Sequence, residues 1–192
     1  MKIAILSGKG GSGKTLLAVN LAALVETSIY MDCDVEEPNG HLFFRPNIDQ
    51  ERTVNIQVPV VDAQLCDGCG ECVAFCKFNA LAYTGQLLIF EALCHACGGC
   101  FRMCPKQALH PKEKTIGVIK KGHQDQTTII SGFLNPGQAS GTPIIQAMQS
   151  YLTTDKLVFI DCPPGAACVV MDSIREAMVR LKRFVARRRE NA

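Results

Sequence analysis

A run of residues near the N-terminus, Gly8 to Thr15 (GKGGSGKT), combines glycines with two lysines and two hydroxyl groups. It fits the pattern G-x-x-x-x-G-K-[ST] and lies between an apolar run and a helical pattern, as that motif requires. In such a loop, backbone N–H groups surround phosphates at a helix N-terminus, where the helix dipole favours negative charge. Lys14 would reach the β- and γ-phosphates, and the Thr15 hydroxyl would bind Mg²⁺. A chance glycine-rich turn is the alternative. The predicted nucleotide-binding residues are Gly8, Lys9, Gly10, Gly11, Ser12, Gly13, Lys14 and Thr15.

Two acidic residues at the ends of apolar runs are expected to complete this site. Asp161 ends LVFID and is predicted to hold Mg²⁺, with Gly165 in DCPPG contacting the γ-phosphate through its N–H group. Asp34 ends SIYMDCD and is predicted to orient the attacking water. Either acid could instead be a turn residue that follows a strand.

Two cysteine motifs share the spacing C-x2-C-x2-C-x3-C. Three cysteines at intervals of three wrap one [4Fe–4S] cluster, while the fourth belongs to the other cluster. Crossed ligand sets are therefore expected: Cys66, Cys69, Cys72 and Cys104 for cluster 1, and Cys94, Cys97, Cys100 and Cys76 for cluster 2. Tetrahedral zinc is the alternative, although zinc sites usually use two separated C-x2-C pairs.

The cysteine motifs belong to an internal repeat. CDGCGECVAFCKFNAL at 66–81 and CHACGGCFRMCPKQAL at 94–109 match at every cysteine, at Gly70 and Gly98, and at the closing Ala-Leu. Two copies of one motif indicate two equivalent sites. The remaining cysteines are Cys33 and Cys162, which are expected to be small core residues, and Cys168, whose role is open.

The elements that position these motifs alternate along the chain. Strand patterns cover 2–7, 28–34, 53–61, 126–134 and 156–165, and helical patterns cover 14–26 and 143–152. This alternation predicts an α/β domain with a mainly parallel sheet. Residues 1–61 and 113–192 would form that domain, which is interrupted by a small α+β insert at 62–112.

The glycine loop with its additional lysine, followed by DCDVEEPN and DCPPG, resembles the deviant Walker A ATPases of the MinD, ParA and Mrp type. The resemblance implies a P-loop NTPase-type fold, ATP and Mg²⁺ as cofactors, and an ATP-dependent homodimer. It assigns Lys9 to phosphates bound by the partner subunit, Asp34 to positioning water, and Asp161 to the Mg²⁺ shell. Lys9 could instead be a solvated loop lysine.

The insert resembles a bacterial ferredoxin with two [4Fe–4S] clusters, with one departure at Lys77, where proline commonly follows the fourth cysteine. Together the two halves resemble MinD-superfamily ATPases that carry an inserted ferredoxin domain. This implies an ATPase that couples nucleotide state to electron transfer, with an unidentified redox or cluster-acceptor protein as partner. The alternatives are an iron–sulfur carrier or scaffold, and an electron-transfer module with a vestigial ATPase half.

Composition and the C-terminal segment limit the partners. The balance of 20 basic and 18 acidic residues does not favour nucleic acid. No apolar run is long enough for a membrane span and no secretion signal is recognised, so a cytoplasmic location is expected. The ATPase fold is expected to be shortened after residue 165, where the family continues with an adenine-binding segment. The last residues predict an amphipathic helix that covers the sheet or contacts a membrane, with Ile174, Ala177, Met178, Leu181, Phe184 and Val185 on its apolar face.

Overall fold

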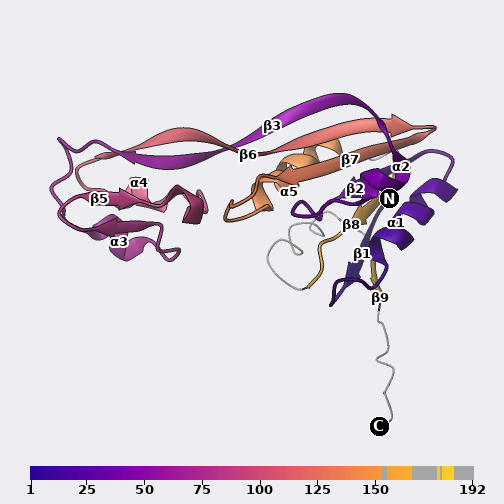
Figure 1. Ribbon diagram of the computed structural model, residues 1–192, viewed down its shortest axis with the longest axis horizontal. Coiled ribbons are helices and arrows are strands. Elements are labelled where there is room, and N and C mark those ends of the chain that lie inside the picture. The colour runs from indigo at the N-terminus through magenta and orange to yellow at the C-terminus, as the bar shows by residue number, and fades with distance from the viewer. Residues whose placement is uncertain (153–154, 166–176, 178, 184–192) are drawn as a thin grey trace, which may run out of the picture. The chain divides into compact units, whose positions relative to one another are not determined.

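The computed structural model describes residues 1–152, 155–165, 177 and 179–183, and the chain divides into two compact units (Figure 1). The first unit comprises Met1–Thr53, Gly117–Leu134 and Gly141–Ala192. The second comprises Val54–Ile116 and Asn135–Ser140. Two long strands, β3 (Asn47–Val61) and β6 (Leu109–Gln124), each continue from one unit into the other without a break.

The main sheet has the strand order β3-β6-β7-β2-β8-β1-β9. The strands not yet located are β1 (Lys2–Ser7), β2 (Ser28–Asp32), β7 (Thr127–Leu134), β8 (Leu157–Asp161) and β9 (Val179–Arg183). β2 pairs in parallel with β7 and β8, and β1 pairs in parallel with β8 and β9, while β6 is antiparallel to β7. The predicted α/β class with a mainly parallel sheet is confirmed.

Helices of the first unit pack on both faces of this sheet. α1 (Lys14–Leu24) contacts β1, β2 and β8, α2 (Gly40–Phe44) contacts α1 and β7, and α5 (Thr142–Met148) contacts β7 and is followed by the 3₁₀ helix η2 (Gln149–Tyr151). Figure 1 shows α1 alongside β1 and β2. No helix in the described part of the chain is long and apolar enough to cross a membrane.

The core of the first unit forms where α1 meets the sheet. Small residues of α1 let the helix approach the strands closely, and the cluster comprises Ile5, Ala18, Val19, Ala22, Tyr30, Phe44, Ile129 and Phe159. On β7, Ile129 faces this cluster, whereas a Cβ added at Gly132 would meet Ile144 and Met148 of α5. Because strand residues alternate between faces, Ile129, Ser131 and Phe133 share the face that carries α1 and α2.

Three strands differ from the sequence prediction. β6 was not expected as a strand, and only the second half of β3 was. The predicted C-terminal helix is wrong over Val179–Arg183. This segment forms strand β9, which pairs with β1 in the register Ile3↔Val179. The segment VRLKR alternates apolar and basic residues, a period-two pattern that suits a strand at a sheet edge. Of the other residues on the predicted helical face, Ala177 is described as irregular, and Ile174, Met178, Phe184 and Val185 lie outside the described residues, as does Cys168.

In the second unit, the two copies of the sequence repeat also share similar backbone conformations. Its elements are α3 (Glu71–Phe75), the antiparallel pair β4 (Leu81–Tyr83) and β5 (Leu87–Ile89), η1 (Glu91–Leu93) and α4 (Gly99–Met103). Each short helix follows a left-handed glycine, Gly70 (φ 76°) or Gly98 (φ 70°). Two further repeat-equivalent pairs also have positive φ: Gly68 with Ala96, and Asn79 with Gln107. Residue for residue, the two copies adopt the same turns.

Candidate functional site

The glycine loop connects β1 to α1 in a conformation that depends on glycine. Gly11 and Gly13 have φ values of 67° and 79°, in the left-handed region that favours glycine. A Cβ added at Gly8, Gly10 or Gly11 would meet no atom within 4 Å, so the space beside the loop is open. The Ser12 hydroxyl oxygen is buried and has no hydrogen-bond partner. The loop thus presents free space and an unsatisfied polar group together.

The two lysines of the loop have different environments. The Lys14 side chain lies at the start of α1 and the residue is only 7% exposed, which is unusual for a lysine. Its ammonium group lowers the pKa values of Asp34 and Asp161, so it lies near both acids. Lys9 is exposed, and its backbone oxygen accepts a hydrogen bond from the Ser7 hydroxyl at 2.7 Å. Lys14 therefore faces inward, while Lys9 is accessible from outside the unit.

Two aspartates meet at the carboxyl ends of neighbouring parallel strands. Asp32 and Asp161 are paired in register on β2 and β8, and both are 1% exposed. Asp161 accepts a hydrogen bond from the Tyr30 hydroxyl at 3.0 Å through Oδ2, while its Oδ1 is buried without a partner. Burial raises the pKa of Asp161, and interactions with the Thr15 and Tyr30 hydroxyls oppose this rise. The structure thus brings Thr15 and Asp161 together, as the metal prediction required.

Asp32 holds the segment that follows β2. Its Oδ2 accepts a hydrogen bond from the Gly40 N–H at 2.9 Å, and its Oδ1 accepts one from the Asp34 N–H at 3.2 Å. Burial, followed by the charge of Asp161, raises the pKa of Asp32 to about 7. Asp34 itself is partly buried, and burial raises its pKa to about 6 against the lowering effect of Lys14. Asp34 therefore lies close to the glycine loop, and Asp32 fixes the backbone that carries it.

Gly165 lies beside the loop but its N–H group is engaged. This N–H donates to the Ser7 carbonyl oxygen at 3.2 Å, and Gly165 has a φ of 99°. The predicted contact of the same N–H with a terminal phosphate would require this hydrogen bond to break. Cys33 and Cys162 are both fully buried, as expected of small core residues, and burial raises the pKa of the Cys162 thiol to about 12.

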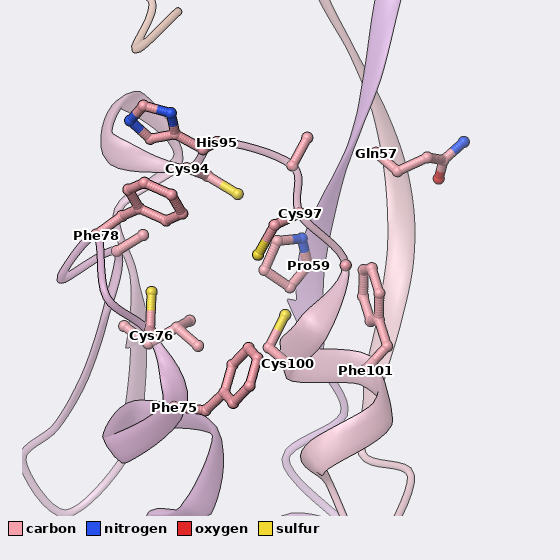
Figure 2. Close-up of a pocket in the computed structure, with 14 residues that line it drawn as sticks. Gln57, Pro59, Phe75, Cys76, Phe78, Cys94, His95, Cys97, Cys100 and Phe101 are labelled. Atoms are coloured by element: carbon pink, nitrogen blue, oxygen red, sulfur yellow. The ribbon is translucent and has the colours of Figure 1, made fainter. Parts of the chain in front are cut away.

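The cysteines of the second unit line two separate pockets. Cys76, Cys94, Cys97 and Cys100 line the first, with Phe75, Phe78, Phe101 and Pro59 among its walls. Figure 2 shows the sulfur atoms of these four cysteines directed into the space between them. Cys66, Cys69, Cys72 and Cys104 line the second pocket, together with Tyr83, Leu87 and Leu109. Each pocket therefore gathers three cysteines from one motif and the last cysteine from the other.

Two of these cysteines, Cys104 and Cys100, have distinct local environments. The Ala108 N–H donates to the Cys104 sulfur at 3.2 Å. Burial raises the pKa of the Cys100 thiol to about 11, with a further contribution from Cys94 and Cys97. Beside the pocket, the ring of His95 stacks on Phe78 with centroids 3.9 Å apart. Within the described residues, no group of three or more His, Cys, Asp or Glu side chains is arranged to hold a metal ion.

Sequence reasoning did not single out Tyr30 or Asp32. Both lie in SIYMDCD two residues apart, so they share one face of β2. A tyrosine and an acid with the same orientation at the end of a buried strand are the signal that was available. Their contact with Asp161 depends on β2 and β8 being neighbours, which is a property of the sheet order and not of either segment.

Comparison with known families decides the class of the chain. Residues 3–190 match the family model described as the CobQ/CobB/MinD/ParA nucleotide binding domain. The chain belongs to this nucleotide-binding family. Within it, the glycine loop and the acids at the ends of β2 and β8 form the candidate nucleotide site.

Individual relatives are longer than this chain. Two uncharacterized proteins of Methanocaldococcus jannaschii are 32% identical over 189 residues and 30% identical over 186 residues. The alignments cover 94% and 92% of this chain, and the chain spans 66% of the length of each relative. A solved structure of the septum site-determining protein MinD from Pyrococcus horikoshii, complexed with Mg-ADP, matches with a TM-score of 0.46 and 16% identity. That match covers 94% of this chain and 56% of the MinD chain.

Proposed function

We propose that this protein binds and hydrolyses ATP with Mg²⁺ in its first unit, holds two [4Fe–4S] clusters in its second unit, and couples nucleotide state to electron transfer. The observation that carries the proposal is the division of the motif cysteines between two pockets, each containing one crossed ligand set. Family membership supports the nucleotide half. The partner would be a redox protein that exchanges electrons with the clusters.

Several features support ATP and Mg²⁺ in the first unit. The unpartnered Ser12 hydroxyl, the open space beside Gly10 and the inward Lys14 suit a bound phosphate chain. The free Oδ1 of Asp161 is an oxygen ligand of the kind that Mg²⁺ and its water shell prefer.

Catalysis of ATP hydrolysis would rest on positioning and on electrostatic stabilisation. Lys14 would stabilise the negative charge that develops on the phosphates. The carboxylate of Asp34, with its pKa near 6, stays mostly ionised at neutral pH yet accepts a proton from water more readily than an ordinary aspartate. The exposed Lys9 suits a second role, because an accessible lysine can reach phosphates held by a second copy of the chain.

In its residue types the donor set of the second unit suits iron–sulfur clusters, although the described side chains are not arranged to hold a single metal ion. Four thiolates around an otherwise apolar pocket are the usual ligands of a [4Fe–4S] cluster, which supplies one-electron transfer. Phe75, Phe78 and Phe101 would limit the access of water to that site. The N–H···S hydrogen bond to Cys104 is the kind of contact that tunes cluster potential. The close spacing of three thiolates in each motif favours clusters over zinc.

Anaerobic reconstitution with iron and sulfide tests the cluster half. We expect about eight iron atoms per chain, four for each cluster. Cys76→Ser and Cys97→Ser should perturb the same cluster in electron paramagnetic resonance spectra, because crossed ligation gives them one site. Cys33→Ala, a buried cysteine outside the motifs, is the matched control and should keep full iron. Two zinc ions per chain with no iron-dependent spectrum would overturn the assignment.

A second candidate function, delivery of clusters to other proteins, is favoured by one observation. Each pocket includes one exposed cysteine, Cys69 or Cys97, through which an acceptor thiol could approach the cluster. Incubation of the reconstituted protein with an apo-ferredoxin distinguishes the two functions. Rapid and complete transfer of iron would identify a carrier, whereas retention of both clusters supports electron transfer.

A further inference from the structure

Tyr30 is a fully buried tyrosine whose hydroxyl group reaches the proposed metal site. The residue lies on β2 within the core cluster of the first unit and is 0% exposed. Its hydroxyl donates a hydrogen bond to Oδ2 of Asp161 on the neighbouring strand β8 at 3.0 Å. A phenylalanine would fill the same apolar space without the cost of burying a hydroxyl group. The one atom that distinguishes tyrosine from phenylalanine is thus used to contact Asp161.

The hydroxyl group of Tyr30 crosses to Asp161 although Asp32 is closer in the sequence. Tyr30 and Asp32 share one face of β2, because strand residues two apart point the same way. The two oxygens of Asp32, however, accept the backbone N–H groups of Gly40 and Asp34 at 2.9 Å and 3.2 Å. The two buried acids therefore have different roles: Asp32 holds the backbone after β2, and Asp161 is held by Tyr30.

α2 encloses the side chain of Tyr30. A Cβ added at Gly40 would overlap the ring and the hydroxyl oxygen of Tyr30, so the absence of a side chain at Gly40 leaves room for them. The ring of Phe44 packs at a tilted angle, with its centroid 5.2 Å from that of Tyr30. This enclosure restrains the position of the hydroxyl group and, through the hydrogen bond, the orientation of the Asp161 carboxylate.

The orientation of Asp161 matters for the neighbouring Thr15. The Thr15 hydroxyl also interacts with this carboxylate. In the function proposed above, Thr15 and Asp161 hold Mg²⁺ with its water shell. Hydrogen bonds that orient the ligands of a metal commonly raise its affinity, because the ligands lose less conformational freedom when the metal binds. The hydrogen bond from Tyr30 is of this kind.

We propose that Tyr30 is a positioning residue for the metal site of the first unit: its hydroxyl group holds the Asp161 carboxylate in the orientation in which it and Thr15 take up Mg²⁺ with the nucleotide. This inference rests on the proposed function, because it assumes that the site binds a metal together with the nucleotide. It adds to the site a residue that belongs to the core of the unit.

Calorimetric titration of the full chain with ADP, in Mg²⁺ buffer and in metal-free buffer, tests this role without any turnover. Tyr30→Phe removes only the hydroxyl group. In the presence of Mg²⁺ it should weaken ADP binding about tenfold, since residues that orient metal ligands commonly change metal affinity by about 10–100-fold. In metal-free buffer ADP binding should stay unchanged, because the glycine loop that surrounds the phosphates is intact.

Ile129→Val is the matched control, because Ile129 belongs to the same core cluster and the loss of one methylene group affects packing alone. It should bind ADP like the parent protein in both buffers, and urea unfolding of both variants measures any loss of stability. An equal loss of ADP binding in Ile129→Val would assign the effect to stability and overturn the role of Tyr30.

The same titrations separate this inference from the function on which it rests. Parent-like ADP binding by Tyr30→Phe in Mg²⁺, or an equal loss in both buffers, would overturn the positioning role alone. If Mg²⁺ does not strengthen ADP binding by the parent protein, or if the parent protein binds no ADP, the proposed metal site is overturned together with the role of Tyr30.

Discussion

The two units of this protein relate their sites to their cores in opposite ways. In the first unit, polar residues stand at strand ends, outside a cluster of aliphatic and aromatic side chains such as Ile5 and Phe159. In the second unit, the buried cluster consists of Cys72, Leu81 and Leu109, and other motif cysteines pack around it. In the first unit Tyr30 connects the core to the site, whereas in the second unit the motif cysteines are themselves part of the core.

This difference implies that the stability of the two units depends to different degrees on bound groups. A domain with its own apolar core keeps its fold when its ligand leaves. A unit of this size buries little apolar surface, so metal binding commonly supplies part of its folding free energy. We therefore expect the first unit to be stable without nucleotide and the second to be unstable without clusters.

If the second unit holds the proposed clusters, removal of their iron gives the largest expected effect. Chelation under anaerobic conditions should abolish the hydrogen-exchange protection of amides around Leu81, Cys72 and Cys104, because the thiols then surround empty space. Amides of β2 and β8 should keep their protection, since their core lies elsewhere. Mass spectrometry of exchanged peptides reads both regions in one sample. Protection that survives in the second unit after iron removal would contradict the expected difference in stability between the two units.

Core truncations in the two units should separate stability from cluster content. Phe159→Ala is expected to lower the free energy of unfolding of the first unit by about 3–5 kcal/mol, while cluster spectra stay unchanged. Leu81→Ala should do the reverse, reducing iron retention and leaving the urea midpoint of the first unit unaffected. Circular dichroism and iron analysis of the same preparations provide both readouts. Cluster loss in Phe159→Ala would show that the units are not independent.

The two loop lysines should differ in their effect on ATP. Lys14→Ala should reduce both ATP binding and the hydrolysis rate, the latter by about 10²–10³-fold, because a buried cation beside the phosphates is lost. Lys9→Ala should preserve ATP binding by the single chain and remove ATP-dependent dimerisation. Equilibrium binding and light scattering with MgATP separate these results. Equal loss of ATP binding in both variants would argue against the role of Lys9 at a dimer interface.

The buried acid Asp32 gives the smallest effect, a pH dependence of stability. Its pKa is about 7 in the folded protein, against about 3.9 in an unfolded chain. The folded state therefore holds a proton that the unfolded state releases, so the stabilisation is complete below pH 4 and is lost as pH rises through 7. Between pH 5 and pH 7, the contribution of Asp32 to the free energy of unfolding of metal- and nucleotide-free protein should fall by about 2 kcal/mol, and Asp34 and Asp161, whose pKa values are also raised, add to the fall.

Urea unfolding of Asp32→Asn checks this assignment. The variant should show a flatter pH dependence, because asparagine does not titrate and its side-chain oxygen can still accept the Gly40 N–H. Asp125→Asn, at an exposed turn of the same unit, is the control and should retain the parent slope. An unchanged slope in Asp32→Asn would assign the effect to another group.

Local motifs allowed much of this molecule to be predicted. The glycine loop, the strand before it and the helix after it follow from a pattern contained within 2–26, and cysteine spacing predicts which cysteines line each of the two pockets. β6 was missed because its polar stretch, HPKEKT, does not alternate as an exposed strand usually does. β9 was missed because VRLKR lies inside a longer run that also fits a helical period.

What the sequence could not supply are contacts that depend on sheet order. Asp32 meets Asp161 because β2 lies next to β8, although more than a hundred residues separate them in the chain. Tertiary neighbours, and with them the pKa values and unpartnered atoms, appear only when the strands are assembled.

An anaerobic redox titration followed by electron paramagnetic resonance, with and without MgATP, tests the central claim most directly. If nucleotide state and clusters are coupled, MgATP must shift the midpoint potential or the line shape of at least one cluster, because a ligand that prefers one redox state moves that equilibrium. Lys14→Ala should show no such shift while keeping both clusters. Identical potentials and spectra with and without MgATP, in protein that binds the nucleotide and holds full iron, would contradict the account.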